Sequence, residues 1–226
     1  MKTKITYLTI IASSLMAITN VNAQTLRIKG GMNLSNMLIE DNDITYSDKF
    51  KNRVGYQIGL TIQAPSENVI SFEGGVNFGT RGYNYSETGV FEGVNMKVEQ
   101  EMRLNYLTVP LTAKATVDLG KAKFYANLGP SISIGLNGKV WTKASAGSIS
   151  DESTEDIKWG DDEDNDDLTR FDGGLHAGLG LEFRNVEIGI DYVYGISNIS
   201  PYTKDEFKIN NRNLGITLAY KILGGL

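Results

Sequence analysis

Few residues in this chain have side chains that could support catalysis or hold a metal. His176 is the only histidine among the 226 residues, and the sequence contains no cysteine. A catalytic histidine needs a nucleophile or a second ligand beside it, and no serine follows His176 at the spacing of a lipid-A deacylase or acyltransferase site. The G-x-S-x-G, P-loop and HExxH motifs are also absent. The sequence therefore predicts no catalytic residue, no thiolate metal site and no cofactor, and it argues against an enzyme.

An acidic tract over residues 151–167 is the second candidate for chemistry. Within it Asp162, Asp164 and Asp166 place carboxylates at alternate positions, as some calcium loops do. An EF-hand that begins at Asp162 would need glycine at its sixth position and glutamate at its twelfth. The chain has Asp167 and Gly173 there, so the motif fails. The three aspartates stay a weak calcium candidate, and the alternative is a solvated loop of like charge.

Six charged residues lie at positions where a period of two places polar side chains on one face of a sheet. They are Arg27, Glu73, Lys114, Glu182, Glu187 and Lys221. Buried charges are tolerated only when they are paired, so we expect these six to form an ion-pair network that plugs a barrel lumen near its short turns. Glu182 and Glu187 should be cross-strand neighbours, which requires a base between them. Lys221, on the next strand, is the expected base.

The element that positions these residues most clearly is a hairpin over residues 171–196. Its arms, 171–183 and 186–196, alternate between apolar and small or polar residues on either side of Arg184 and Asn185. The two-residue turn pairs Phe183 with Val186 on the same face, so the apolar faces of both arms match. Each arm is longer than most soluble strands and fits a tilted membrane-spanning strand.

The same alternation predicts eight strands, at about 25–36, 52–63, 69–83, 101–117, 123–138, 171–183, 186–196 and 208–222. Arg103 and Asn105 break the alternation in the fourth, which indicates either a bulge or a segment beyond the bilayer. Connections 64–68, 118–122 and 184–185 are short, whereas 37–51, 84–100, 139–169 and 198–208 are long. Short turns at one end and long loops at the other are typical of an outer-membrane barrel.

Alternation alone does not decide which face is inside, because a soluble lipocalin-like barrel reverses the two faces. The polar face here is crowded with Gly, Ser, Thr and Asn, which suits a narrow lumen better than a soluble exterior. Aromatic residues of the apolar face also gather near both strand ends, which predicts two lipid-facing girdles. They are Phe72, Phe124, Phe183 and Tyr220 near the short turns, and Tyr56, Phe78, Phe171, Tyr192 and Tyr194 toward the long loops. We therefore predict an all-β, eight-stranded antiparallel up-and-down transmembrane β-barrel with its apolar face outward and a filled polar lumen.

The amino terminus predicts export. Lys2 and Lys4 precede an apolar run, and Val21-Asn22-Ala23 resembles a cleavage site, so residues 1–23 read as a signal peptide for Sec-type export. Residues 24–226 would then form the barrel domain. Removing the two lysines takes the net charge from −5 to −7, and so acidic a chain is a poor nucleic-acid binder. The expected location is the outer membrane of a Gram-negative bacterium.

Six segments occur in an order that resembles the PorT-like outer-membrane β-barrel family of Bacteroidetes. They read LRIKGGMNLSN, YLTVPLTAK, NLGPSISIG, FDGGLHAGLGLEF, DYVYGISNI and NRNLGITLAYKI, and together they cover nearly the whole of 24–226. The resemblance implies an eight-stranded outer-membrane barrel and no shared catalytic residues. The chain ends in KILGGL rather than in the terminal aromatic usual for such barrels. Tyr220 is the expected substitute for recognition by the outer-membrane assembly machinery.

These observations favour a non-catalytic integral outer-membrane protein. Its long extracellular loops would serve adhesion, envelope stability or contact with secretion machinery. The expected partners are outer-membrane lipid, the assembly machinery and an extracellular or envelope protein that the loops contact. Two alternatives remain: a small transport channel, disfavoured because eight strands leave a lumen that side chains fill, and a soluble lipocalin-like ligand-binding barrel.

Overall fold

A computed structural model describes residues 24–46, 49–66, 69–91, 94–147 and 149–224. The signal peptide predicted at residues 1–23 lies outside the described residues. Among the described residues, no helix is long and apolar enough to cross a membrane.

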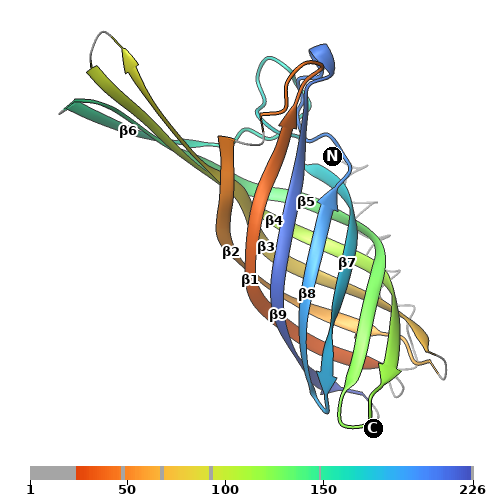
Figure 1. Ribbon diagram of the computed structural model, residues 1–226. Coiled ribbons are helices and arrows are strands. Elements are labelled where there is room, and N and C mark those ends of the chain that lie inside the picture. The colour runs from red at the N-terminus through yellow and green to blue at the C-terminus, as the bar shows by residue number, and fades with distance from the viewer. Residues whose placement is uncertain (1–23, 47–48, 67–68, 92–93, 148, 225–226) are drawn as a thin grey trace.

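Eight antiparallel strands close into a ring, and a ninth lies outside it (Figure 1). In the described part of the chain the strands are β1 (Thr25–Glu40), β2 (Phe50–Gln63), β3 (Ile70–Phe91), β4 (Val94–Asp118), β5 (Lys123–Ala146), β6 (Ile149–Asp156), β7 (Phe171–Phe183), β8 (Val186–Gly195) and β9 (Lys208–Leu223). A short 3₁₀ helix, η3 (Lys204–Glu206), precedes β9. The pairings β1–β9 and β4–β5 complete the ring, so β6 alone is an addition to the eight predicted strands.

Strand β8 shows how the faces are assigned. Its burial alternates strictly, with Glu187, Gly189, Asp191, Val193 and Gly195 buried, and Ile188, Ile190, Tyr192 and Tyr194 exposed. The predicted hairpin is confirmed, since Phe183 pairs with Val186 and Glu182 pairs with Glu187 across the turn. Because polar residues line the inside and apolar residues cover the outside, the transmembrane barrel is confirmed and the lipocalin-like alternative is wrong.

The connections predicted at 84–100 and 139–169 are largely strand, and this corrects the prediction. β3 runs on to Phe91, β4 begins at Val94, and β5 extends to Ala146 and pairs with β6. The four segments form an antiparallel sheet that projects from one end of the barrel, at the upper left of Figure 1. We call this sheet the blade; it comprises Gly82–Phe91, Val94–Arg103, Lys139–Ala146 and Ile149–Asp156.

The break in alternation at Arg103 and Asn105 has a structural cause. The pairing of β4 with β5 shifts register between Asn105 and Tyr106, which is a bulge. Arg103 is the last blade residue of β4, and Leu104 and Asn105 lie between the blade and this shift. Both expectations for this segment therefore apply: it contains a bulge and it projects beyond the membrane-spanning strands.

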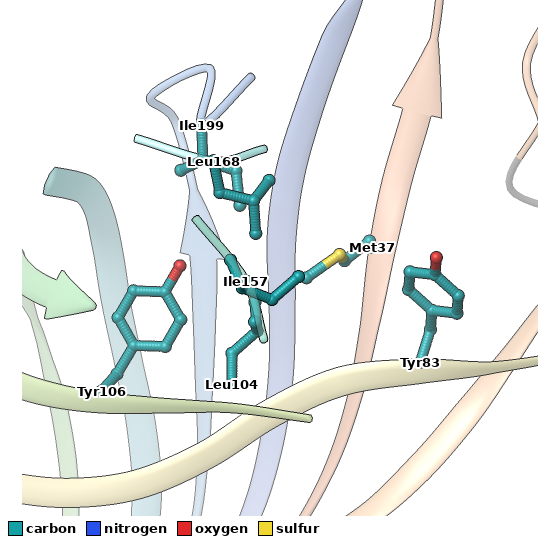
Figure 2. Packing of buried hydrophobic residues seen from close by; sticks show 7 residues of the cluster. All are labelled: Met37, Tyr83, Leu104, Tyr106, Ile157, Leu168 and Ile199. Atoms are coloured by element: carbon teal, nitrogen blue, oxygen red, sulfur yellow. The ribbon is translucent and has the colours of Figure 1, made fainter. Parts of the chain in front are cut away.

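A cluster of buried apolar side chains fills the end of the barrel from which the blade projects (Figure 2). Its members are Met37, Tyr83, Leu104, Tyr106, Ile157, Leu168 and Ile199. Ile157 and Leu168 come from the connection between β6 and β7, and Ile199 comes from the connection between β8 and β9. We call this cluster the plug, because two connections fold back over the lumen to build it.

Candidate functional site

The six charged residues predicted for the lumen meet at its short-turn end. Arg27 is the centre of the group and is almost fully buried. Its guanidinium nitrogens lie 3.3 Å from a carboxylate oxygen of Glu182, 3.3 Å from one of Glu187 and 3.7 Å from one of Glu73. A planar guanidinium can direct separate nitrogens at separate carboxylates, which suits it to this position.

Lys114 is the second cation of the group, and its side chain is fully buried. Its Nζ lies 2.6 Å from Glu187 Oε2, 3.4 Å from Glu73 Oε2 and 4.1 Å from the centre of the Tyr125 ring. Gly189 makes room for that ring, since a Cβ there would lie 2.1 Å from the Tyr125 hydroxyl oxygen. The buried cations Arg27 and Lys114 therefore both have carboxylate partners, as buried ions require.

The base between Glu182 and Glu187 is Arg27, so the expectation that Lys221 would fill this role is wrong. Glu182 and Glu187 are indeed paired across the turn. Lys221 lies 3.9 Å from Glu182 only, and it is partly exposed near the end of β9. Arg27 lies on β1, where it pairs with Lys221. Its guanidinium contacts both Glu182 and Glu187 through separate nitrogens, whereas the ammonium of Lys221 contacts only Glu182.

Two further polar layers fill the lumen above this network, and the alternation of the sequence did not predict them as pairs. Lys29 Nζ lies 2.8 Å from Asp191 Oδ1, and Gln57 donates a 3.0 Å hydrogen bond to the other oxygen of Asp191. Nearer the plug, Arg81 Nη1 lies 2.7 Å from Asp172 Oδ2, and both side chains are buried. The sequence did indicate that these residues line the lumen, because Lys29, Asp191, Arg81 and Asp172 all fall on the polar face of their strands.

His176 also lies in the lumen, buried on β7 opposite Gly129 and Val193. It borders a cavity of about 20 Å³ together with Asn33, Asn77, Arg81 and Asn213. That volume accommodates about one water molecule. The side chains thus fill the interior, as expected for a barrel of eight strands.

A first prediction concerns conductance. The purified protein in a planar lipid bilayer should show no steady ion current, because the charged layers and the plug occupy the lumen. Single-channel recording at several voltages, with an open porin as the positive control, measures this. A stable unit conductance from the folded monomer would contradict the closed lumen.

The acidic tract uses its carboxylates to hold its own backbone. Asp162 accepts hydrogen bonds from the Asp164 amide and the Asn165 side chain, both at 3.0 Å, and Asp166 accepts one from the Asp162 amide. The bonds from the Asn165 side chain and the Asp164 amide lower the pKa of Asp162. Among the described residues, no group of three or more acidic, histidine or cysteine side chains is placed to hold a metal ion. The structure therefore adds no support to Asp162, Asp164 and Asp166 as calcium ligands.

The aromatic residues of the predicted girdles lie on the outer surface. Phe78 is half-buried, and the other eight are exposed. Those exposed eight are Tyr56, Phe72, Phe124, Phe171, Phe183, Tyr192, Tyr194 and Tyr220. This placement suits rings at the two membrane–water interfaces of a barrel.

The two faces of the blade carry different sets of side chains, although neither is uniform: Glu87 and Glu155 share the face of Val98 and Val140, and the exposed Val90 lies on the other face. On one face ion pairs cross between strands, with Lys143 Nζ 2.6 Å from Glu152 Oε1 and Lys139 Nζ 3.5 Å from Asp156 Oδ1. The bond from Lys143 lowers the pKa of Glu152, and the same contact raises the pKa of Lys143. The opposite face carries an apolar stripe, which we define as Val94, Met96, Val98 and Ile149, and all four side chains are exposed.

A closed ring of eight strands with charged layers inside and an apolar exterior defines an outer-membrane β-barrel. The chain belongs to the family described as "Outer membrane protein beta-barrel domain", which matches residues 22–200. β9, which closes the ring against β1, lies beyond the matched residues. The protein is therefore an integral outer-membrane protein of a Gram-negative bacterium. Short turns face the periplasm in such barrels, which places the blade and the plug outside the cell.

Three solved structures are similar to this chain. Ail, the attachment invasion locus protein of Yersinia pestis, is 16% identical over 88% of this chain and 99% of its own, with a TM-score of 0.36. OprG of Pseudomonas aeruginosa is 13% identical over 90% and 98%, with a TM-score of 0.44. Neisserial surface protein A is 13% identical over 87% and 97%, with a TM-score of 0.40. A comparison with curated protein sequences gave no match.

Proposed function

We propose that this protein is a non-catalytic anchor that presents its blade to a protein partner outside the outer membrane. The observation that carries this proposal is the apolar stripe. Val94, Met96 and Val98 have relative exposures of 44%, 42% and 38%, and Ile149 reaches 76%. These side chains lie outside the bilayer, so lipid does not cover them.

The stripe is the uncovered half of one continuous sheet face. Directly paired residues share a face, and both Met96 and Ile149 pair with Ala146. Closer to the barrel the same face carries Met102 and Val140, which pack against the plug. Exposed apolar side chains grouped on a water-facing surface favour an interaction site. The exposed outer edge of β6 adds backbone groups that a partner strand could pair with.

The resemblance to PorT-like barrels supports a finer assignment within this role. The six sequence segments fit that branch, and contact with secretion machinery is then one form of the proposed partnership. Adhesion and envelope stability are the others. All three use the same surface, so one experiment addresses them together.

The experiment is site-specific photo-crosslinking on intact cells. A photoreactive phenylalanine analogue placed at Met96 should give a covalent adduct with a defined protein, because Met96 is in the stripe. The same analogue at Lys97 is the matched control, since Lys97 is the next residue and lies on the charged face. Mass spectrometry identifies the adduct.

A second variant separates the stripe from the fold. Val98→Asp should abolish the Met96 adduct while the barrel stays folded, because Val98 lies outside the bilayer. Heat-dependent gel mobility checks folding. Equal adducts from Met96 and Lys97, or none from either, would overturn the proposal. Deleting residues 139–169 is a poorer test, because it also removes Ile157 and Leu168 from the plug.

A further inference from the structure

The outer edge of β6 is an open edge of the blade. In the described part of the chain β6 is the last strand of the sheet, and all eight of its residues are exposed. The Ile157 amide donates a hydrogen bond to the Gly138 carbonyl, and this pair continues the register of β6 with β5. Hydrogen-bonded pairs alternate along an antiparallel ladder, so the odd-numbered residues of β6 direct their backbone groups toward β5. The backbone groups that point away from the sheet are those of Ser150, Glu152, Thr154 and Asp156.

This edge is acidic, and part of its charge has no partner. Lysines of β5 contact Glu152 and Asp156 on the charged face of the blade. Within the described residues, Asp151 and Glu155 form no ion pair. Paired residues share a face, so Asp151 and Glu155 lie on the face of the apolar stripe together with Ile149. A strand added to this edge would therefore meet two unpaired carboxylates and one exposed apolar side chain.

A second copy of this chain does not fit the edge. Two β6 strands paired antiparallel about Ser153 would place Asp151 of each copy opposite Glu155 of the other. A register centred on Glu152 would place the two copies of that residue opposite each other. Like charges directly opposite across a sheet are destabilising, so the charge of the edge selects a partner strand with basic side chains.

The other open edge of the blade lacks this combination. β2 pairs with β3 as far as Tyr85, so residues 86–90 of β3 also have a free side. The carboxylate there belongs to Glu87, which accepts hydrogen bonds from Lys49 at 3.2 Å and from Tyr85. Open backbone groups and unpaired carboxylates therefore coincide at β6.

We propose that the edge of β6 accepts an extended basic segment of the protein partner as an additional strand of the blade. The inference rests on the proposed function, and it adds where the partner pairs and which charge it carries. Main-chain hydrogen bonds would hold the segment, as in other strand additions. In an antiparallel arrangement, two residues four apart on the segment would lie opposite Glu155 and Asp151, and a third, two residues further on, would lie opposite Ile149. We expect lysine or arginine at the first two positions and an apolar residue at the third.

The test measures the binding of capped peptides, each as long as β6, to the protein in phosphatidylcholine nanodiscs. The probe alternates valine with lysine, and the matched control alternates valine with glutamate. Fluorescence anisotropy of the labelled peptide gives the affinity, and hydrogen exchange reports strand pairing. The lysine peptide should bind and protect the amides of Glu152 and Thr154. The glutamate peptide should bind at least about tenfold more weakly.

Three variants separate strand pairing from charge attraction. Thr154→Pro removes an outward amide, which an edge strand tolerates, and should weaken binding of the lysine peptide on the order of tenfold. Thr154→Val keeps that amide and should bind as the unsubstituted protein does. Asp151→Asn with Glu155→Gln keeps the backbone and should also weaken binding on the order of tenfold. The Ser153 amide, which faces β5, should stay protected in each variant, and this checks that β6 remains in the sheet.

Equal binding of both peptides, no binding of either, or binding that Thr154→Pro leaves unchanged would each overturn the proposal. The photo-crosslink at Met96 tests the proposed function separately. A Met96 adduct that Thr154→Pro does not diminish would overturn strand addition and leave the proposed function standing. If Met96 gives no adduct while the lysine peptide binds as expected, the proposed function fails and the edge is still a site for basic strands. Loss of the adduct in Thr154→Pro but not in Thr154→Val would support both.

Discussion

Replacing Lys114 with methionine is expected to lower the free energy of unfolding by about 3–5 kcal/mol, the usual effect of breaking a buried ion pair. Methionine fills a similar volume, so the loss comes from charge rather than from a cavity. Glu187 would lose its 2.6 Å contact and Glu73 its 3.4 Å contact with the ammonium. Arg27 would then be the remaining cation close to both carboxylates.

Unfolding of the reconstituted protein in guanidinium, with the folded fraction monitored by heat-dependent gel mobility, measures this effect. Lys221→Met is the matched control, because Lys221 is partly exposed and reaches Glu182 only at 3.9 Å. Its effect should stay below about 1 kcal/mol, the range of solvated pairs. Adding Glu187→Gln to Lys114→Met should recover part of the loss, since it removes one unpaired charge. Equal losses for Lys114→Met and Lys221→Met would contradict the network as described.

Arginine at the middle of the apolar exterior is expected to destabilise the barrel by roughly 2–4 kcal/mol, the range for the bilayer midplane. Leu179 and Ile190 are paired across β7 and β8, and they are 51% and 48% exposed in the isolated chain. Leu179→Arg or Ile190→Arg would place a guanidinium in hydrocarbon. The same unfolding experiment in vesicles measures the loss.

The control lies at the end of β9. Leu223→Arg places the charge near the interface, where arginine costs roughly 0–1 kcal/mol. Leu179→Ala adds a second check, because lipid fills the space that the shorter side chain leaves. The loss should therefore be smaller than the roughly 2–5 kcal/mol of a core substitution. A core-sized loss for Leu179→Ala, with no loss for Leu179→Arg, would contradict lipid contact.

The sequence predicted the barrel well because the bilayer imposes a strict rule on each strand. Along β8, Ile188 and Ile190 face lipid, and Glu187 and Asp191 face the lumen. These opposite requirements produce a period of two that can be recognised in the sequence. The same rule placed all six charged residues of the short-turn network on one face. Alternation could not identify Arg27 as the base between Glu182 and Glu187, because it predicts which face a side chain lies on and not how far that side chain reaches.

The blade was missed for the complementary reason. Beyond the bilayer water can surround both faces of a sheet, so neither face has to be apolar. Lys97, Glu99 and Lys143 are therefore equally compatible with a solvated loop. The strands there are fixed by pairing, such as Met96 with Ala146, rather than by burial. The plug was missed because Ile157, Leu168 and Ile199 are isolated apolar residues in separate connections, and only the closed ring brings them together.

The continuity of β3, β4 and β5 from the membrane into the blade has a mechanical consequence. β4 extends without interruption from Val94 at the tip to Asp118 at the periplasmic end, and it stays paired with β3 and β5 along most of that length. In the described residues, the junction between the part proposed to bind a partner and the part held by lipid contains the bulge at Asn105 and Tyr106, but β4 continues through it as one strand. A pull on the tip would load the ladders with neighbouring strands in shear. Slippage by even one residue would reverse every side chain between lipid and lumen, so traction at the cell surface would pass directly to the barrel wall.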